Sequence, residues 1–159
     1  MTTRQFALTR TTSASGRALY DLLADVPAWV GWAPLVSHAE LIATGPADPT
    51  GKGAVRRVGG LWVISVDEEI LDADPGRKQV YTATRGLPVS AYEARVEFVE
   101  QGSTTLLTWS SSFVAKPAFL GPILRVLLRA AIGRLATGLV EAAEGGGASR
   151  GVTEAPSND

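Results

Sequence analysis

Cysteine is absent from this sequence of 159 residues, so it can form no disulfide framework, thiolate nucleophile or zinc–thiolate site. Histidine occurs once, and His38 has no acidic partner at a motif spacing, so we interpret it as a surface residue. The serines at 110–112 lack the Gly-x-Ser-x-Gly turn of a nucleophile elbow. The glycines at 51 and 53 lack the third glycine and the following helix of a dinucleotide fingerprint. The sequence therefore predicts a protein without a metal or nucleotide cofactor.

Net charge is almost absent as well, because 15 Lys and Arg residues stand against 16 Asp and Glu residues. A neutral domain has no long-range attraction for nucleic acid or for an anionic membrane. The apolar run at 120–140 contains Arg125, Arg129 and Arg134, which argues against a membrane-spanning helix. We expect these arginines to neutralise strand carboxylates or to cap the sheet edge. The N-terminus has no apolar signal stretch, so we expect a cytoplasmic protein without nucleic-acid binding or stable membrane insertion.

One long helical pattern is present, from Gly121 to Glu144. Apolar residues recur in it at spacings of three and four and so share one face: Leu124, Leu128, Ala131, Leu135, Leu139 and Ala142. The glycines at 145–147 predict the end of this helix. Leu127, Ile132 and Val140 lie partly outside the cavity face, so either a closely wrapped sheet or a second chain would cover them.

Almost everything before that helix has the alternation of strands. The predicted strands are 4–12, 38–43, 54–58, 62–71, 79–85, 90–100 and 104–115. Two helices, at 16–26 and 28–35, separate the first two strands, and Ser13 or Ser15 caps the first of them. Gly59 and Gly60 are predicted to form a turn. A long helix after a run of strands is expected to cover the open face of a curved sheet.

Several short patterns follow this order of elements: Asp25-Val-Pro-Ala-Trp29, Gly53-Ala-Val-Arg56, the acidic stretch from Glu68 to Gly76, Tyr81, Gly86-Leu-Pro with Tyr92, and Trp109 with Phe113. With them the chain resembles the START and birch-pollen-allergen superfamily, also called SRPBCC or helix-grip, over about residues 4–144. The bacterial branch labelled polyketide cyclase/dehydrase-like is the most similar. The resemblance implies an α+β fold in which a seven-stranded antiparallel sheet wraps round the C-terminal helix and leaves a ligand cavity. The length of the chain predicts a single domain, at 1–144, and the Gly, Ser, Pro and charged residues at 145–159 predict a flexible tail.

Successive side chains of a strand point to opposite faces of the sheet, so the more apolar set of alternate residues is predicted to face inward and to form the cavity wall. In the strand at 62–71 the even positions, which include Trp62 and Glu68, are the more apolar set, so they are expected to face inward. The plant abscisic acid receptors of the same superfamily have a similar inward glutamate and tyrosine, which resemble Glu68 and Tyr92. The predicted ligand-binding residues are Trp29, Trp32, Ile64, Val66, Glu68, Tyr92, Ala94, Trp109, Ser111, Leu128 and Leu135.

The polar residues of this wall are open to two interpretations. In a catalytic interpretation Glu68, Tyr92 and Arg56 move protons, since desolvation would favour the protonated Glu68 carboxyl. In the alternative, Glu68 pairs with Arg56 and only orients a ligand. Asp67 and Glu69 alternate with Glu68 and are expected on a solvated outer face. The tryptophans are either ligand-stacking surfaces or core.

The sequence thus predicts a protein that binds a small hydrophobic molecule, such as a lipid, sterol or polyketide, as a monomer or homodimer. The alternative is a polyketide aromatase/cyclase or dehydratase that uses cavity acid and base residues without cofactors. A third possibility, an accessory that acts through a protein partner, has no sequence feature in its favour.

Overall fold

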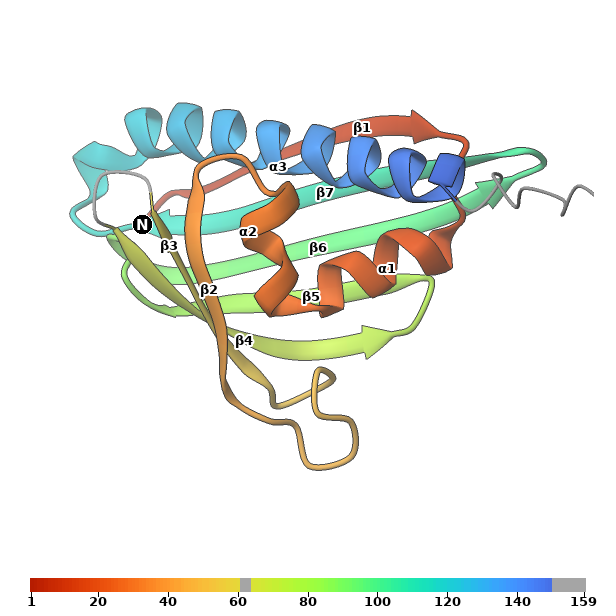
Figure 1. Cartoon of the computed structure of the whole chain (residues 1–159). Helices are drawn as coiled ribbons and strands as arrows, with labels where there is room; N and C mark the ends of the chain where they lie inside the picture. The colour runs from red at the N-terminus through yellow and green to blue at the C-terminus, as the bar shows by residue number, and fades with distance from the viewer. Residues whose placement is uncertain (61–63, 150–159) are drawn as a thin grey trace, which may run out of the picture.

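The computed structural model describes residues 1–60 and 64–149, and only the backbone for residues 147–149. Its seven strands form one antiparallel sheet in the order β1-β7-β6-β5-β4-β3-β2. The strands are β1 Thr3–Thr12, β2 Val36–Ala43, β3 Val55–Gly60, β4 Ser65–Asp74, β5 Lys78–Arg85, β6 Val89–Gln101 and β7 Thr104–Ala115. Figure 1 shows this sheet curving beneath the long helix α3, which is the expected helix-grip arrangement.

The helices begin and end where the sequence chemistry requires. Helix α1 (Gly16–Ala24) starts at Ser15, whose hydroxyl accepts a hydrogen bond from the Ala18 N–H at 3.1 Å. A 3₁₀ turn, η1 (Val26–Ala28), contains Pro27 and leads into the one-turn helix α2 (Trp29–Trp32). A second 3₁₀ turn, η3 (Ala118–Leu120), precedes α3 (Gly121–Ser149). None of the described helices combines the length and hydropathy needed to cross a bilayer.

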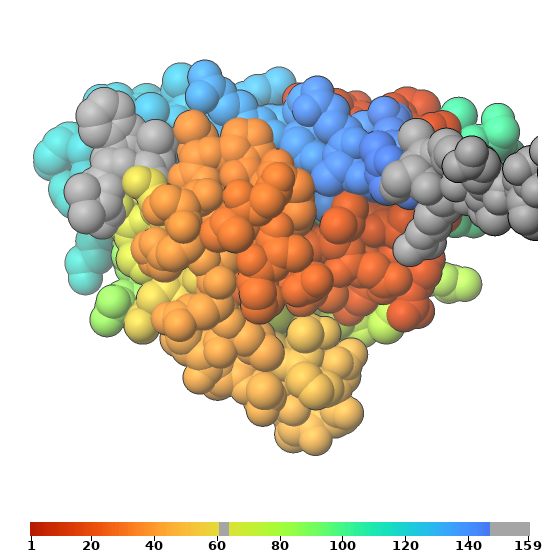
Figure 2. All heavy atoms as spheres, viewed as in Figure 1, coloured from red at the N-terminus to blue at the C-terminus, as the bar shows by residue number. Residues whose placement is uncertain are grey.

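Helix α3 is gripped between the sheet and the α1–α2 segment. Its buried residues follow helical spacing: Leu124, Ile132, Ala136, Leu139 and Ala143. Close approach to the α2 side depends on Gly138, where an added Cβ would lie only 2.7 Å from the Pro34 ring. Figure 2 shows the orange and red atoms of α1 and α2 directly against the blue atoms of α3.

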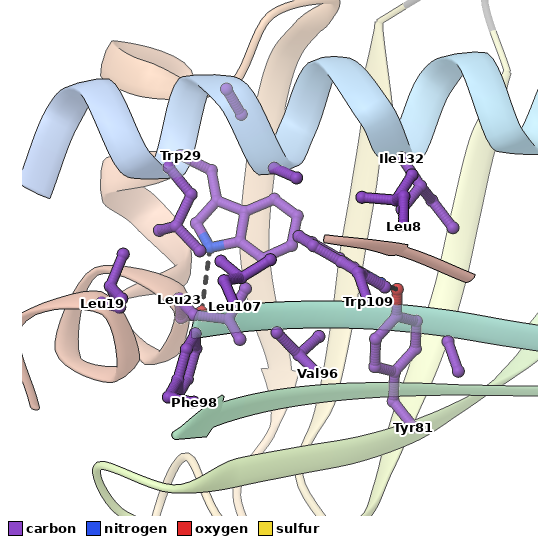
Figure 3. Packing of buried hydrophobic residues seen from close by; sticks show 14 of the residues in the cluster. Leu8, Leu19, Leu23, Trp29, Tyr81, Val96, Phe98, Leu107, Trp109 and Ile132 are labelled. Carbon is purple, nitrogen blue, oxygen red and sulfur yellow. Dashed lines mark hydrogen bonds between the residues drawn. The ribbon is translucent and has the colours of Figure 1, made fainter. Parts of the chain in front are cut away.

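The core contains two fully buried tryptophans with satisfied indole N–H groups (Figure 3). Trp29 donates to the Leu23 carbonyl at 3.0 Å, and Trp109 donates to the Tyr81 hydroxyl at 3.1 Å. Each bond removes the cost of burying an unpaired polar group. The first bond links α2 to α1, and the second links β7 to β5.

Glycine is where the sequence predictions of local structure were wrong. Gly59 and Gly60 belong to β3 rather than to a turn, because the missing Cβ of Gly59 leaves room for the His38 imidazole on β2. Gly145 and Gly146 do not end α3, which continues to Ser149 with helical backbone. A glycine inside a helix lowers the stability of that helix by only about 1 kcal/mol relative to alanine. The adjacent turns of α3 can therefore keep the glycine backbone helical. The predicted start of the fourth strand at Trp62 and Val63, and the tail at 150–159, lie outside the described residues.

The β2–β3 connection, residues 44–54, extends from the sheet on the side away from α3 (Figure 1). It is folded on itself by bonds from the Gly45 N–H to the Pro49 carbonyl and from the Gly51 N–H to the Asp48 carbonyl. At its end Gly53 and Ala54 exchange backbone hydrogen bonds with Ile70 of β4. The connection is therefore an ordered projection from the sheet.

Candidate functional site

A cavity of about 210 Å³ lies between the sheet and α3. Its wall is mostly aliphatic or aromatic, and among the described residues the charged or hydroxyl-bearing ones that line it are Glu68, Tyr81 and Tyr92. The described residues that line it are Trp29, Pro34, Leu35, Val36, Val58, Gly59, Gly60, Ile64, Val66, Glu68, Tyr81, Leu87, Tyr92, Leu128, Ala131, Ile132 and Leu135. A mostly apolar wall with a few polar groups is typical of small-molecule sites.

The alternation of β4 places Glu68 on this wall. Val66 and Glu68 line the cavity, whereas Asp67 lies on the opposite face of the strand. Asp67 was expected to be solvated, and this was wrong, because arginine side chains cover it. Arg57 Nε lies 2.7 Å and Arg85 Nε 3.6 Å from its carboxylate oxygens, and the Arg57 hydrogen bond lowers the pKa of Asp67.

Glu68 is bound by a buried arginine on the neighbouring strand. Arg56 and Glu68 are direct partners in the β3–β4 register, and Arg56 Nε donates to Glu68 Oε2 at 2.7 Å. The Arg56 side chain is 1% exposed and the Glu68 side chain 15% exposed. Arg56 Nη1 also donates to Gln79 Oε1 at 2.8 Å. The ion pair therefore spans the wall, with the guanidinium inside it and the carboxylate at the cavity surface.

Two aromatic rings enclose the guanidinium. Arg56 Cζ lies 4.6 Å from the ring centroid of Trp29 and 4.6 Å from that of Tyr81. Stacking on π faces compensates a desolvated guanidinium in a way that an ammonium could not reproduce. Arg56 Nη2 is buried and has no hydrogen-bond partner among the described residues. Arg56 thus holds Glu68 in place and supports Trp29, although it does not itself line the cavity.

The hydroxyl groups of the two tyrosines of the wall are un-ionised at physiological pH. Burial, followed by the Glu68 charge, raises the pKa of Tyr92 to about 12. Burial also raises the pKa of Tyr81 well above its ordinary value. Efficient general acids have a pKa near the working pH, so these environments suit hydrogen bonding better than proton transfer. Their ring centroids are 6.4 Å apart, so both hydroxyl-bearing rings belong to one aromatic cluster.

The predicted ligand-binding residues divide into two groups. Those that line the cavity are Trp29, Ile64, Val66, Glu68, Tyr92, Leu128 and Leu135. Those outside the lining are Trp32, Ala94, Trp109 and Ser111. Ala94, Trp109 and Ser111 are buried in the core, and the Trp32 ring packs against Trp29 at 5.3 Å. A binding or catalytic role for any of these residues, or for Arg56, stays a prediction.

Some lining residues were not selected from the sequence. Ile132 was predicted to lie partly outside the cavity face of α3, but it is buried and lines the cavity, because the sheet and α2 enclose a wide arc of the helix. Tyr81 is the register partner of Ala94, a position predicted to face inward, so the strand pairing would have identified it. His38, predicted at the surface, is exposed.

Solved structures with the same fold support this architecture. The Zhui aromatase/cyclase from Streptomyces sp. R1128 superposes with a TM-score of 0.78 at 17% sequence identity, over 90% of this chain and 94% of that chain. A START superfamily protein from Mycobacterium smegmatis gives a TM-score of 0.75 at 17% identity, over 88% and 97% of the two chains. A norcoclaurine synthase from Thalictrum flavum superposes with a TM-score of 0.71 at 14% sequence identity, over 89% of this chain and 94% of that chain. At these identities the similarity establishes the fold.

Sequence comparison establishes the family. No match was found among curated protein sequences. The sequence model of the family described as "Polyketide cyclase / dehydrase and lipid transport" matches residues 3–144, which contain the whole sheet, the cavity and nearly all of α3. The chain therefore belongs to the polyketide cyclase/dehydrase and lipid transport family.

Proposed function

We propose that this protein binds a small hydrophobic molecule in the cavity beneath α3. The observation that carries the proposal is an apolar cavity in which Glu68, the one charged group among the lining residues that the structure describes, is held at the surface by a buried arginine. An ion pair inside a protein costs desolvation energy that well-packed apolar residues would avoid. A role for Glu68 in orienting a ligand accounts for its place in an otherwise apolar wall.

Cavity size limits the ligand. An apolar cavity of about 150 Å³ accommodates benzene, and drug-sized ligands occupy pockets of about 300–1,000 Å³. The cavity here, at about 210 Å³, falls between these sizes and suits a ligand of about two fused rings. A longer molecule would place one end in the cavity and extend through its mouth.

The polar groups limit the ligand further. The Glu68 carboxylate can accept a hydrogen bond from a ligand hydroxyl, whereas it would repel a ligand carboxylate. The Tyr92 hydroxyl can donate to a ligand oxygen. A bicyclic or larger aromatic molecule with a phenolic hydroxyl therefore matches the site better than a fatty acid.

The test compares naphthol, naphthalene and naphthoate as probes, with binding followed by tryptophan emission. We expect naphthol to bind best and naphthoate worst. Ala131→Phe fills the cavity and should abolish binding, whereas Ala130→Phe changes the adjacent, exposed residue and should not. Mass spectrometry of the purified protein under native conditions would identify any molecule that remains bound. Equal binding by the two phenylalanine variants would contradict the proposal.

A second candidate is an aromatase/cyclase or dehydratase activity. It is favoured by the overall similarity to the Zhui aromatase/cyclase and by the presence of Glu68 and Tyr92 on one cavity wall. In this case Glu68 would act as the proton acceptor, because the raised pKa of Tyr92 makes it a weak acid. The Glu68→Gln variant described in the Discussion separates this activity from simple binding.

A further inference from the structure

Charge is segregated along this nearly neutral chain. No Asp or Glu occurs between Glu100 and Glu141, whereas that stretch contains Lys116, Arg125, Arg129 and Arg134. The sequence before Asp21 has no acidic residue either. These two stretches form β1, β7 and most of α3, which pack against one another. Of the 16 acidic residues, 12 therefore fall from Asp21 to Glu100 in the sequence, outside these two stretches.

The outer face of α3 carries exposed apolar side chains in the same region. Ile123 is 60% exposed, Val126 64% and Leu127 60%, and their spacing of three and four places them in one stripe along the helix. Phe119, in the turn just before the helix, is 77% exposed. Figure 1 shows the N-terminal half of α3 above the sheet, at the edge of the fold. We call these four residues the outer stripe.

Arginines border the outer stripe on the β1 side. Arg125 Nε donates to the Gln5 carbonyl at 3.0 Å, and Arg10 Nε donates to Thr137 Oγ1 at 3.2 Å, so both side chains bridge β1 and α3. A surface groove of about 660 Å³ runs between them, also lined by Arg129 and Arg134. Within the described part of the chain, Glu141 is the one acidic residue of the lining, and it follows these arginines in the sequence. None of the ion pairs in the described part of the chain involves Arg125, Arg129 or Arg134. The expected pairing of these arginines with strand carboxylates was therefore wrong, whereas Arg125 does cap the sheet edge.

We propose that the outer stripe and its arginines dock on the surface of an anionic lipid bilayer. Helices that lie in a membrane interface combine exposed apolar side chains with cations that meet lipid phosphates. A neutral chain was expected to have no attraction for such a surface, but a face with cations and few acids attracts it at short range whatever the net charge. This docking is interfacial, since it requires side chains but no helix to enter the lipid.

Other occupants fit the face less well. In a twofold dimer the same patch meets itself, so the four arginines of the groove would face their copies with Glu141 as the one acidic residue among the described lining residues to pair with. Nucleic acid would satisfy the arginines but leave the outer stripe in water, because phosphate backbones offer no apolar contact. A bilayer interface satisfies both sets of side chains.

Docking would also bring the cavity to the lipid. Leu127 belongs to the outer stripe, whereas the next residue, Leu128, lines the cavity. A bound bilayer would thus contact the same helical turn that forms part of the cavity wall. This consequence rests on the proposed function, whereas the docking itself does not.

The experiment measures flotation of the full chain with phosphatidylcholine vesicles, with and without phosphatidylserine, at low ionic strength and at about 0.15 M salt. We expect binding to require phosphatidylserine and to weaken with salt. The Val126→Ser/Leu127→Ser variant should lose binding. The Arg129→Ala/Arg134→Ala variant should weaken it by about fivefold for each arginine, from about 1 kcal/mol per cation near an anionic surface.

Matched controls come from exposed residues elsewhere. Val99→Ser removes an exposed apolar side chain of β6, and Arg77→Ala removes an exposed cation before β5, and neither should alter vesicle binding. The changed residues of the outer stripe do not line the cavity, so all variants should bind naphthol like the unaltered chain. Failure of the docking is therefore distinguishable from failure of the cavity proposal.

Three results would overturn the proposal. The first is no binding to either vesicle, and the second is equal, salt-independent binding to both. The third is a different occupant, shown by a dimer that Val126→Ser/Leu127→Ser dissociates in size-exclusion chromatography, or by DNA that the arginine variant releases in a mobility shift. Circular dichroism of each variant verifies that it is folded.

Discussion

Arg56 and Glu68 form an ion pair of 2.7 Å between directly opposed positions of β3 and β4, with the guanidinium sealed between Trp29 and Tyr81. This ion pair both connects two strands of the sheet and places a carboxylate at the surface of the cavity. A change in either partner should therefore alter both the free energy of unfolding and ligand affinity, and the two effects can be measured separately.

We expect Arg56→Met to lower the free energy of unfolding by about 3 kcal/mol or more, because it leaves the Glu68 carboxylate and the Gln79 amide without their buried partner. Urea denaturation measures the effect. The matched control is Arg17→Met, which breaks an exposed pair with Asp21 within one helix and should cost only a few tenths of a kcal/mol. Equal losses for the two variants would show that the buried pair has no special structural role.

The Glu68→Gln variant separates binding from catalysis. If Glu68 orients a hydroxyl-bearing ligand, affinity for naphthol should fall about tenfold or more, since hydrogen bonds to charged groups contribute about 1.5–3 kcal/mol. Affinity for naphthalene should hardly change. Glu69→Gln, on the other face of β4, is the control and should leave both affinities unchanged.

A different outcome of the same variant would favour the enzyme. Loss of turnover of a poly-β-ketone substrate, with affinity for that substrate retained, would assign Glu68 a proton-transfer step. Unchanged naphthol affinity and unchanged turnover would remove Glu68 from both proposals.

The lowered pKa of the Asp67 carboxyl group predicts how the free energy of unfolding changes at acidic pH. Its pKa is lowered, chiefly by the hydrogen bond from Arg57, so its stabilising contribution is present above the unfolded value of about 3.8. That contribution is lost as the pH falls through the lower folded value. Asp67→Asn should therefore flatten, below about pH 4, the fall of the free energy of unfolding with pH. Asp72, whose pKa Lys78 lowers, should preserve part of the slope.

Urea denaturation at several acidic pH values tests this dependence, and a double-mutant cycle assigns it. Arg57→Met should weaken the same slope, and adding it to Asp67→Asn should change little further. Additive effects of the two substitutions would contradict the assignment to this pair.

Tyrosine ionisation should begin late in the native protein. The pKa of Tyr92 is raised to about 12, and those of Tyr20 and Tyr81 are also raised, so little phenolate absorbance is expected near pH 10. Tyr92→Phe should remove the step near pH 12. Because the unfolded phenols ionise near pH 10, stability falls as the pH rises above that value, so circular dichroism must verify the fold at each point. Full titration near pH 10 in a folded sample would contradict the burial of these rings.

The sequence predicted the order of elements and the inward face of β4, because alternation over many residues carries a strong signal. Period two fixes the face of Glu68, and the structure places it on the cavity wall. Alternation does not predict how deeply a side chain is buried. Arg56 shares a face of β3 with Val58, but the burial of Arg56 depends on Trp29 of α2, which is distant in the sequence.

The failures have a common physical origin in tertiary contacts. Gly59 looked like a turn residue, yet its role is to admit the His38 side chain of the neighbouring strand. Ile132 was predicted at the margin of the cavity face because the sequence pattern indicates one apolar face of the helix. In the structure α3 is enclosed over a wider arc, and Ile132 is buried. The charge segregation was visible in the sequence, but only the fold shows that β1 and α3 bring those cations together.

The ordered projection between β2 and β3 offers a place to attach a reporter. Ala47 is exposed there, and the projection extends away from α3 at the other end of the molecule in Figure 1. Because the chain has no cysteine, Ala47→Cys would create a unique thiol for a fluorophore or spin probe. Such a probe would remain in water while the opposite side of the molecule touched lipid, so its collisions with a water-borne quencher would reveal which way the protein faces.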